Sequence, residues 1–114
     1  MIVRTWHGWT TPDNADAYRQ LLDTTIVPGI LARAIPGLRG VDVLWRRGHD
    51  GEVEFLTIMT FDGWPAVEAF AGPDSTASVV PASARRLLAR YDRHAQHYEL
   101  IARHPDAGGS AGAR

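Results

Sequence analysis

The chain has 114 residues, and its 12 basic and 13 acidic side chains give a formal net charge of −1. A near-neutral chain of this length is expected to form one domain, and it gives no electrostatic case for binding nucleic acid or an anionic membrane. Cysteine and lysine are both absent. Their absence excludes a thiol nucleophile, a thiolate metal ligand, a disulfide and a Schiff-base lysine.

The N-terminal residues lead directly into an expected strand, without the apolar segment of a signal peptide. No apolar run approaches the roughly 20 residues that a membrane-spanning helix needs. We therefore expect a cytoplasmic protein that has no membrane partner.

The first third of the chain predicts a strand followed by a helix. Residues 2–10 are expected to be a strand, with alternate side chains on opposite faces. Thr11 and Pro12 are a typical helix start, an N-cap residue followed by proline. The buried stripe of this helix is expected to contain Ala15, Tyr18, Leu21, Leu22 and Ile26. The Pro-Gly pair at 28–29 should break or kink the helix, and a shorter helical piece is expected over residues 30–35.

Residues 41–61 contain the strongest regular pattern, which predicts two strands joined by a tight polar turn. Val41, Val43 and Trp45 alternate with Asp42, Leu44 and Arg46, and β-branched and aromatic residues are frequent over 53–61. The turn at 48–51 contains two glycines and an aspartate. Both faces of the second strand are largely apolar, which predicts a sheet covered on both sides. The helices of the chain can cover one side, and a second subunit could cover the other.

The second half of the chain predicts two more helices and a final strand. Asp62 is expected to cap a helix that has an early proline and ends at the Gly-Pro pair 72–73. After an irregular turn, a further helix is expected over 82–91 and a strand over 96–102. Residues 105–114 contain no apolar anchor, and we expect this tail to be disordered.

The predicted order of elements, β-α-β-β-α-β, is that of the split-βαβ or ferredoxin-like unit. It indicates an α+β domain over residues 1–104, with an antiparallel sheet of strand order 4-1-3-2 and helices on one face. The apolar second face predicts a homodimer in which the two sheets close into a barrel.

Two histidines and a carboxylate are the candidate catalytic residues: His7, His97 and Glu54. In the order 4-1-3-2, the end of the first strand should place His7 near His97 and near Glu52 or Glu54. A histidine held by a carboxylate could act as a general base near neutral pH. Whether they share a face depends on register, because a one-residue slip inverts a strand. The alternative is that each histidine is hydrogen-bonded for structure or lies in the dimer interface.

Aromatic residues and one arginine are the candidate substrate-binding residues. The four tryptophans could line a flat aromatic pocket or serve core and dimer packing. Arg4 falls on a face that should be largely covered, so it needs a partner, either across a dimer or in an anionic phenolate or enolate. The substrate-binding candidates are Arg4, Trp6, Trp9, Tyr18, Trp64 and Phe70. No spacing typical of a metal site occurs, and no metal is expected.

Short segments distributed over residues 1–101 resemble the antibiotic biosynthesis monooxygenase-like family of dimeric α+β barrels. These segments are Arg4–Gly8, Ala15–Tyr18, Ile35–Gly37 leading to Gly40-Val41, Glu54–Thr57, Ala66–Gly72 and His97–Glu99. The resemblance implies the ferredoxin-like fold. Proteins of this superfamily include cofactor-independent oxygenases of polyketide phenols, haem-degrading oxygenases, quinol oxygenases, polyketide cyclases and members with no known activity.

The resemblance implies a small cofactor-independent monooxygenase that acts on an aromatic or polyketide-type substrate. The alternatives are a polyketide cyclase or isomerase, a haem-binding member with altered ligation, and a non-catalytic ligand-binding dimer. The haem-degrading branch carries a proximal histidine in the second helical region. The comparable stretch here, residues 74–80, has none, so no cofactor is expected and haem would need another ligand.

Overall fold

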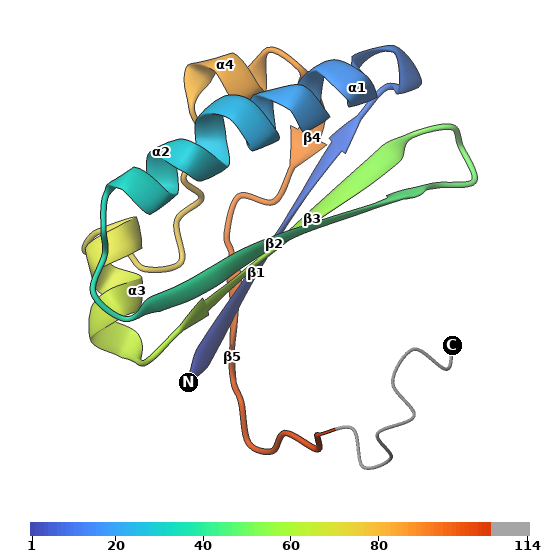
Figure 1. The fold of residues 1–114 in the computed structure, drawn as a ribbon. Helices are drawn as coiled ribbons and strands as arrows, with labels where there is room; N and C mark the ends of the chain where they lie inside the picture. Colours follow the sequence, from blue (N-terminus) through green and yellow to red (C-terminus); the bar gives the residue numbers. More distant parts are fainter. Residues whose placement is uncertain (106–114) are drawn as a thin grey trace.

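The computed structural model describes residues 1–105, which form a five-stranded antiparallel sheet with helices on one face (Figure 1). The strands are β1 (Ile2–Thr10), β2 (Leu38–Arg47), β3 (Val53–Phe61), β4 (Leu88–Tyr91) and β5 (Gln96–Glu99). The order across the sheet is β2-β3-β1-β4, and β5 also pairs with β1. β4 lies beside the end of β1 and β5 lies beside its beginning, so together they occupy the fourth position. The predicted α+β, ferredoxin-like order 4-1-3-2 is confirmed.

The helical segments are α1 (Pro12–Leu21), a π-helical turn (Leu22–Ile26), α2 (Val27–Ala32), α3 (Trp64–Ala71) and α4 (Ala82–Arg85). The Thr11 side chain accepts a hydrogen bond from the main-chain N–H of Asn14, as expected of an N-cap. Pro28 does not break the first helix. Its ring has no N–H and would crowd the carbonyl four residues earlier, and the wider π-helical turn just before it accommodates both effects.

The predicted helix over 82–91 is wrong in its second half, because residues 88–91 are strand β4. The main chain of these residues pairs with Gly8–Thr10 of β1, and Leu88 packs against the cluster beneath α1. Non-local pairing therefore overrides the local helical pattern. The last strand ends at Glu99 and not at residue 102. Most of the tail predicted to be disordered, residues 106–114, lies outside the described residues.

Asp62 does not cap α3, which begins after Gly63 without a side-chain cap. The Asp62 carboxylate instead accepts hydrogen bonds from Arg39 Nε and Nη2, at 2.5 and 2.7 Å. These bonds hold the pKa of Asp62 below its usual value. The pair joins the start of β2 to the end of β3, where the helix α3 follows.

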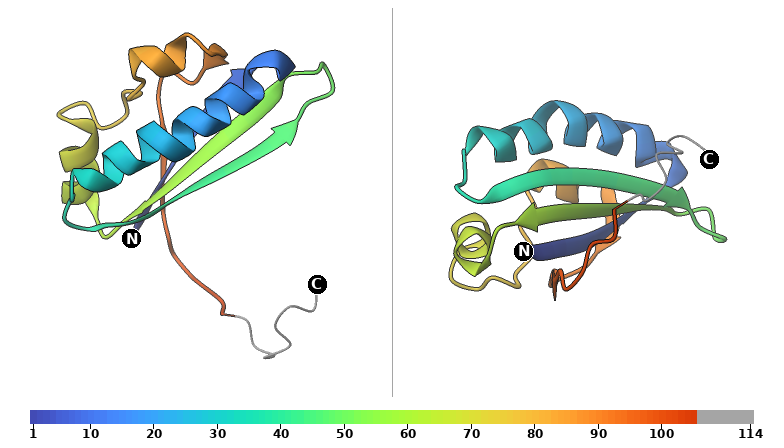
Figure 2. Two further views of the ribbon diagram at one scale, coloured as in Figure 1. Left: turned by 45° about the horizontal axis from the view of Figure 1, so that its top comes forward. Right: turned by 60° about the horizontal axis from the view of Figure 1, so that its bottom comes forward.

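The two faces of the sheet differ sharply. Figure 2 shows α1 and α2 lying across one face. On this face, the β3 side chains that belong to the core are Val53, Phe55, Met59 and Phe61. The opposite face, called here the open face, presents Leu56 and Ile58 of β3, both partly exposed, and the exposed Leu44 of β2. No helix in the described part of the chain is long and apolar enough to cross a membrane.

The backbone at Gly37 provides a test of this architecture. Gly37 has φ of +88°, and an added Cβ would lie 3.0 Å from Ala66 Cβ of α3. The left-handed conformation alone costs an L-residue about 1–2 kcal/mol. We expect Gly37→Ala to lower the free energy of unfolding by at least about that amount in urea titrations. Gly40→Ala is the control, since it has open space and no positive φ. Equal effects of the two changes would contradict this account.

Candidate functional site

A cavity lies between the helix α1–α2 and the side of β1 and β3 that faces it. The space inside it that a water-sized sphere can occupy is about 60 Å³, and the space free of atoms is about 540 Å³ when the solvent-open mouth is included. The lining is mainly apolar and is formed by the helical segment α1–α2, by β3, by α3 and by the residues that precede α4. Its apolar members include Leu22, Ile26, Val27, Ile30, Met59, Phe70, Val79, Val80 and Pro81. An apolar lining with a few polar groups is typical of small-molecule sites. Four of the six predicted substrate-binding residues line it, namely Arg4, Trp6, Tyr18 and Phe70.

Arg4 is the charged residue of this cavity, and it is only 3% exposed. Alternation along β1 turns it toward the helices. Its Nη1 donates to the Ser75 carbonyl at 2.6 Å, and its Nη2 donates to the Ala77 carbonyl at 2.9 Å. Phe70 lies under the guanidinium, with 5.2 Å between Cζ and the ring centroid. Within residues 1–105, no carboxylate pairs with this cation. Burial lowers the pKa of Arg4, although an arginine stays protonated in proteins.

Arg4 and Tyr18 both have polar hydrogens that are free to meet a ligand. Neither Arg4 Nε nor the Tyr18 hydroxyl has a hydrogen-bond partner among residues 1–105. No fully buried side-chain nitrogen or oxygen in this part of the chain lacks a partner, so both atoms keep accessible surface. Both residues line the cavity. Burial raises the pKa of Tyr18 to about 12, so its hydroxyl is protonated at neutral pH and can donate.

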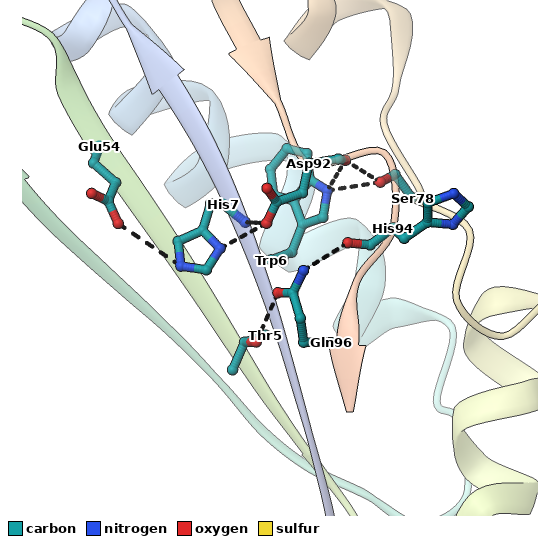
Figure 3. Close-up of polar contacts among 8 residues, drawn as sticks. All are labelled: Thr5, Trp6, His7, Glu54, Ser78, Asp92, His94 and Gln96. Atoms are coloured by element: carbon teal, nitrogen blue, oxygen red, sulfur yellow. Dashed lines mark hydrogen bonds and ion pairs between the residues drawn. The ribbon is translucent and has the colours of Figure 1, made fainter. Parts of the chain in front are cut away.

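Side chains of β1 also hold the segment that covers the cavity. Trp6 Nε1 donates to Ser78 Oγ at 2.9 Å and to the Asp92 carbonyl at 2.8 Å (Figure 3). Ser78 Oγ donates to the same Asp92 carbonyl. Together with the bonds from Arg4, these contacts attach residues 75–78 to the sheet. The next residues, 79–81, are part of the cavity wall.

His97 lies beside Arg4 on strand β5, with its Nε2 3.1 Å from Arg4 Nη1. Arginine can only donate, so His97 Nε2 must accept and its proton must be on Nδ1. Burial, and then the positive charge of Arg4, lower the pKa of His97 below its usual value. Trp64 of α3 packs against its ring, with centroids 5.3 Å apart, and remains 43% exposed.

His7 lies on the open face, between two carboxylates (Figure 3). Its Nδ1 is 2.7 Å from Asp92 Oδ2, which also accepts the main-chain N–H of His7 at 3.0 Å. Its Nε2 is 3.8 Å from Glu54 Oε2, and Arg46 Nε donates to the other oxygen of Glu54 at 3.0 Å. Trp9 stacks on the His7 ring, with centroids 5.8 Å apart.

The expectation that His7 and His97 lie together is wrong. The register pairs Arg4 with His97, and directly paired residues share a face, so His97 is on the side of Arg4. His7, three residues further along β1, points to the opposite face. Glu54 does lie beside His7, as expected, whereas Glu52 pairs with Arg90 at 2.8 Å. Of the predicted substrate-binding residues, Trp9 is beside His7 and Trp64 is outside the cavity.

Sequence reasoning missed Asp92 as a partner of His7. Asp92 directly follows a segment rich in apolar residues, and this pattern could have indicated a polar residue at the end of a strand. The expected helix over 82–91 instead placed that segment away from β1. The carbonyls of Ser75 and Ala77 were also missed. Main-chain groups of an irregular segment carry no sequence signal for such a role.

The sequence matches no known family model and no curated protein. The solved structures that are similar to this chain include those of the following three proteins. Rv0793 from Mycobacterium tuberculosis is 21% identical, with a TM-score of 0.57 over 90% of this chain and 96% of that one. A candidate antibiotic biosynthesis monooxygenase from Bacillus cereus is 10% identical, with a TM-score of 0.64 over 92% and 97%. An ethyl tert-butyl ether D (EthD) family protein from Bacillus halodurans is 20% identical, with a TM-score of 0.53 over 89% and 100%.

These identities are low, so the similarity establishes a fold and not an activity. The chain has the fold of the antibiotic biosynthesis monooxygenase-like proteins, in agreement with the resemblance of its sequence segments.

Proposed function

We propose that the protein is a small monooxygenase-like enzyme that oxidises an aromatic or polyketide-type phenol in the cavity beneath α1 and α2, without a bound cofactor. The observation that supports this function is Arg4, a buried cation in an apolar cavity. It has no carboxylate partner in residues 1–105, and its Nε–H is free. A planar, acidic aromatic molecule would fit this environment, because its apolar body would pack against the lining and its negative oxygen would pair with Arg4.

In the proposed reaction, Arg4 stabilises the phenolate by a charge-assisted hydrogen bond, and the phenolic proton passes to solvent. Tyr18 can donate a second hydrogen bond to an anionic oxygen. The electron-rich ring then reacts with O₂ at a ring carbon that carries hydrogen. One oxygen atom becomes the second carbonyl of a quinone and the other leaves as water, so the substrate supplies all the electrons. The cavity contributes orientation and stabilisation of charge.

The alternatives differ in what they require of the cavity. Haem fits it poorly, because no histidine is among the lining residues and His97 Nε2 is occupied by Arg4. A cyclase, an isomerase or a non-catalytic binding protein would use the same cavity without consuming oxygen. Oxygen uptake therefore separates the proposed function from all three.

Replacing Arg4 tests the proposed function directly. We expect Arg4→Met to weaken binding of ionised hydroxynaphthalenes and anthrone-type phenols by about 10- to 100-fold, the effect of losing one charge-assisted hydrogen bond. Oxygen uptake and quinone absorbance should fall with it. Arg86→Met is the matched control, since Arg86 is exposed and not part of the cavity. Unchanged binding and oxygen uptake in a folded Arg4→Met protein would refute the role of Arg4.

A second candidate site is the open face around His7. Asp92 holds Nδ1, which leaves Nε2 directed toward Glu54 and the solvent side of the sheet. His7 would act there through Nε2 as a general base for a molecule bound on the open face, with Asp92 orienting the ring through Nδ1. Trp9, stacked on His7, would supply part of the binding surface.

On this second proposal, His7→Asn lowers turnover by about 10²–10⁴-fold, the usual contribution of a positioned base, and leaves the melting temperature nearly unchanged. A structural role predicts a lower melting temperature, with activity that follows the folded fraction. His49→Asn, in the exposed turn after β2, is the control. Full turnover by the His7→Asn protein would exclude His7 from the mechanism.

We also propose that the protein is a homodimer joined through its open faces. The partly exposed apolar centre of this face consists of Val3, Leu56 and Ile58. At its sides are Leu44, which is 47% exposed, and Tyr98, which is 57% exposed. A patch of this kind is expected to be covered by a partner. A second copy would also enclose His7 between the two sheets.

The dimer proposal predicts a change of mass on a single substitution. Ile58→Arg should give a folded monomer by light scattering at micromolar concentration, because a charge would be buried without a partner in the interface. Leu31→Arg, an exposed position on α2, should leave the dimer intact. A monomeric wild-type protein would rule out the interface.

A further inference from the structure

We propose that His97 is a positioning residue that holds the Arg4 guanidinium against the sheet, with its Nε–H directed at the cavity, and thereby gives the cavity a preference for anionic oxygen ligands. The geometry of the pair stands independently of any reaction. The ligand preference rests on the proposed function, since it concerns the same cavity.

The argument begins with the hydrogens of the guanidinium. Arginine carries five N–H donors in a fixed planar fork, one on Nε and two on each terminal nitrogen. The Ser75 carbonyl and His97 Nε2 take both hydrogens of Nη1, and the Ala77 carbonyl takes one of Nη2. The Nε–H and one Nη2–H remain. Because the group is planar, the bonds at Nη1 decide where these remaining hydrogens point.

The three acceptors are not equivalent. Ser75 and Ala77 belong to the irregular segment that leads into the cavity wall at 79–81. His97 belongs to β5 and is held in register by the pairing of β1 with β5. It is therefore the acceptor that the sheet itself keeps in place. Without it, the guanidinium is held only by main-chain carbonyls of this irregular segment.

The surroundings of His97 keep its ring neutral, as an acceptor must be. Arg4 of β1 faces it with a positive charge, and Trp64 of α3 covers it with an uncharged ring. On its own strand, Glu99 is two residues away and exposed. Burial and Arg4 together lower the pKa of His97. A proton on Nε2 would remove the hydrogen bond and place two cations side by side, so the pair requires the neutral ring.

A first experiment examines the pair without any ligand. Nitrogen-15 NMR of the imidazole should show Nδ1 protonated and Nε2 unprotonated, with titration below the ordinary histidine value of about 6.5. In Arg4→Met, the pKa of His97 should rise because the neighbouring positive charge is gone, and the preference for one tautomer should weaken. A proton on Nε2 at neutral pH, or a titration that Arg4→Met leaves unchanged, would overturn the inference.

A second experiment measures ligand preference with two probes of equal shape, 2-naphthoate and the uncharged 2-naphthamide. The wild-type protein should bind the anion more tightly. His97→Leu should reduce the ratio of the two affinities by about tenfold or more, the effect of a misplaced charge-assisted hydrogen bond, with the affinity for the amide unchanged. His97→Gln, which can place an oxygen near the position of Nε2, should restore the ratio.

The outcomes separate this inference from the proposed function. An unchanged ratio in His97→Leu, failure of His97→Gln to restore it, or a wild-type protein without preference for the anion would overturn the inference. Failure of the proposed function would instead appear as no oxygen uptake by the wild-type protein with any polycyclic phenol. That result would leave both the NMR titration and the affinity ratio interpretable.

Discussion

The buried guanidinium of Arg4 is the constraint on which the rest of the site depends. An arginine that is almost fully buried must replace its lost hydration by hydrogen bonds. Within residues 1–105, main-chain carbonyls and one histidine provide them, and no carboxylate does. These acceptors come from the segment around residues 75–77 and from β5. Meeting the hydrogen-bonding needs of one side chain therefore connects the central strand, the last strand and the cover of the cavity.

The alternation of side chains along β1 divides the chemistry of the protein between two faces. Arg4 and Trp6 point toward the helices and line an apolar cavity, while His7 and Trp9 point to the open face. The cavity offers a cation and a protonated phenol, which suit an anionic ligand. The open face offers an imidazole between Asp92 and Glu54, which suits proton transfer or an interface between subunits. The cavity lies beneath helices of the chain itself, whereas the open face would be covered by the proposed second subunit.

The path of the first helix makes room for this cavity. A π-helical turn before Pro28 lets α1 continue into α2, so one long helical segment crosses the sheet and contributes Leu22 and Ile30 to the cavity wall. A helix broken at Pro28 would remove part of that wall. Ala84 of the short α4 adds to the cavity wall, and residues 88–91 pair with β1 instead of extending this helix.

The sequence by itself determined the features that depend on neighbouring residues. The alternation over 2–10 and 53–61, the hairpin between two strands and the Thr11 N-cap were all predictable, and with them the ferredoxin-like order of the sheet. The tertiary structure alone decided which residues meet across the fold: His97 with Arg4 and not with His7, Asp62 with Arg39, and residues 88–91 with β1. The physical reason is that periodicity and capping are local, whereas strand register and buried polar pairing result from contacts between distant residues, where a shift of one residue changes every partner.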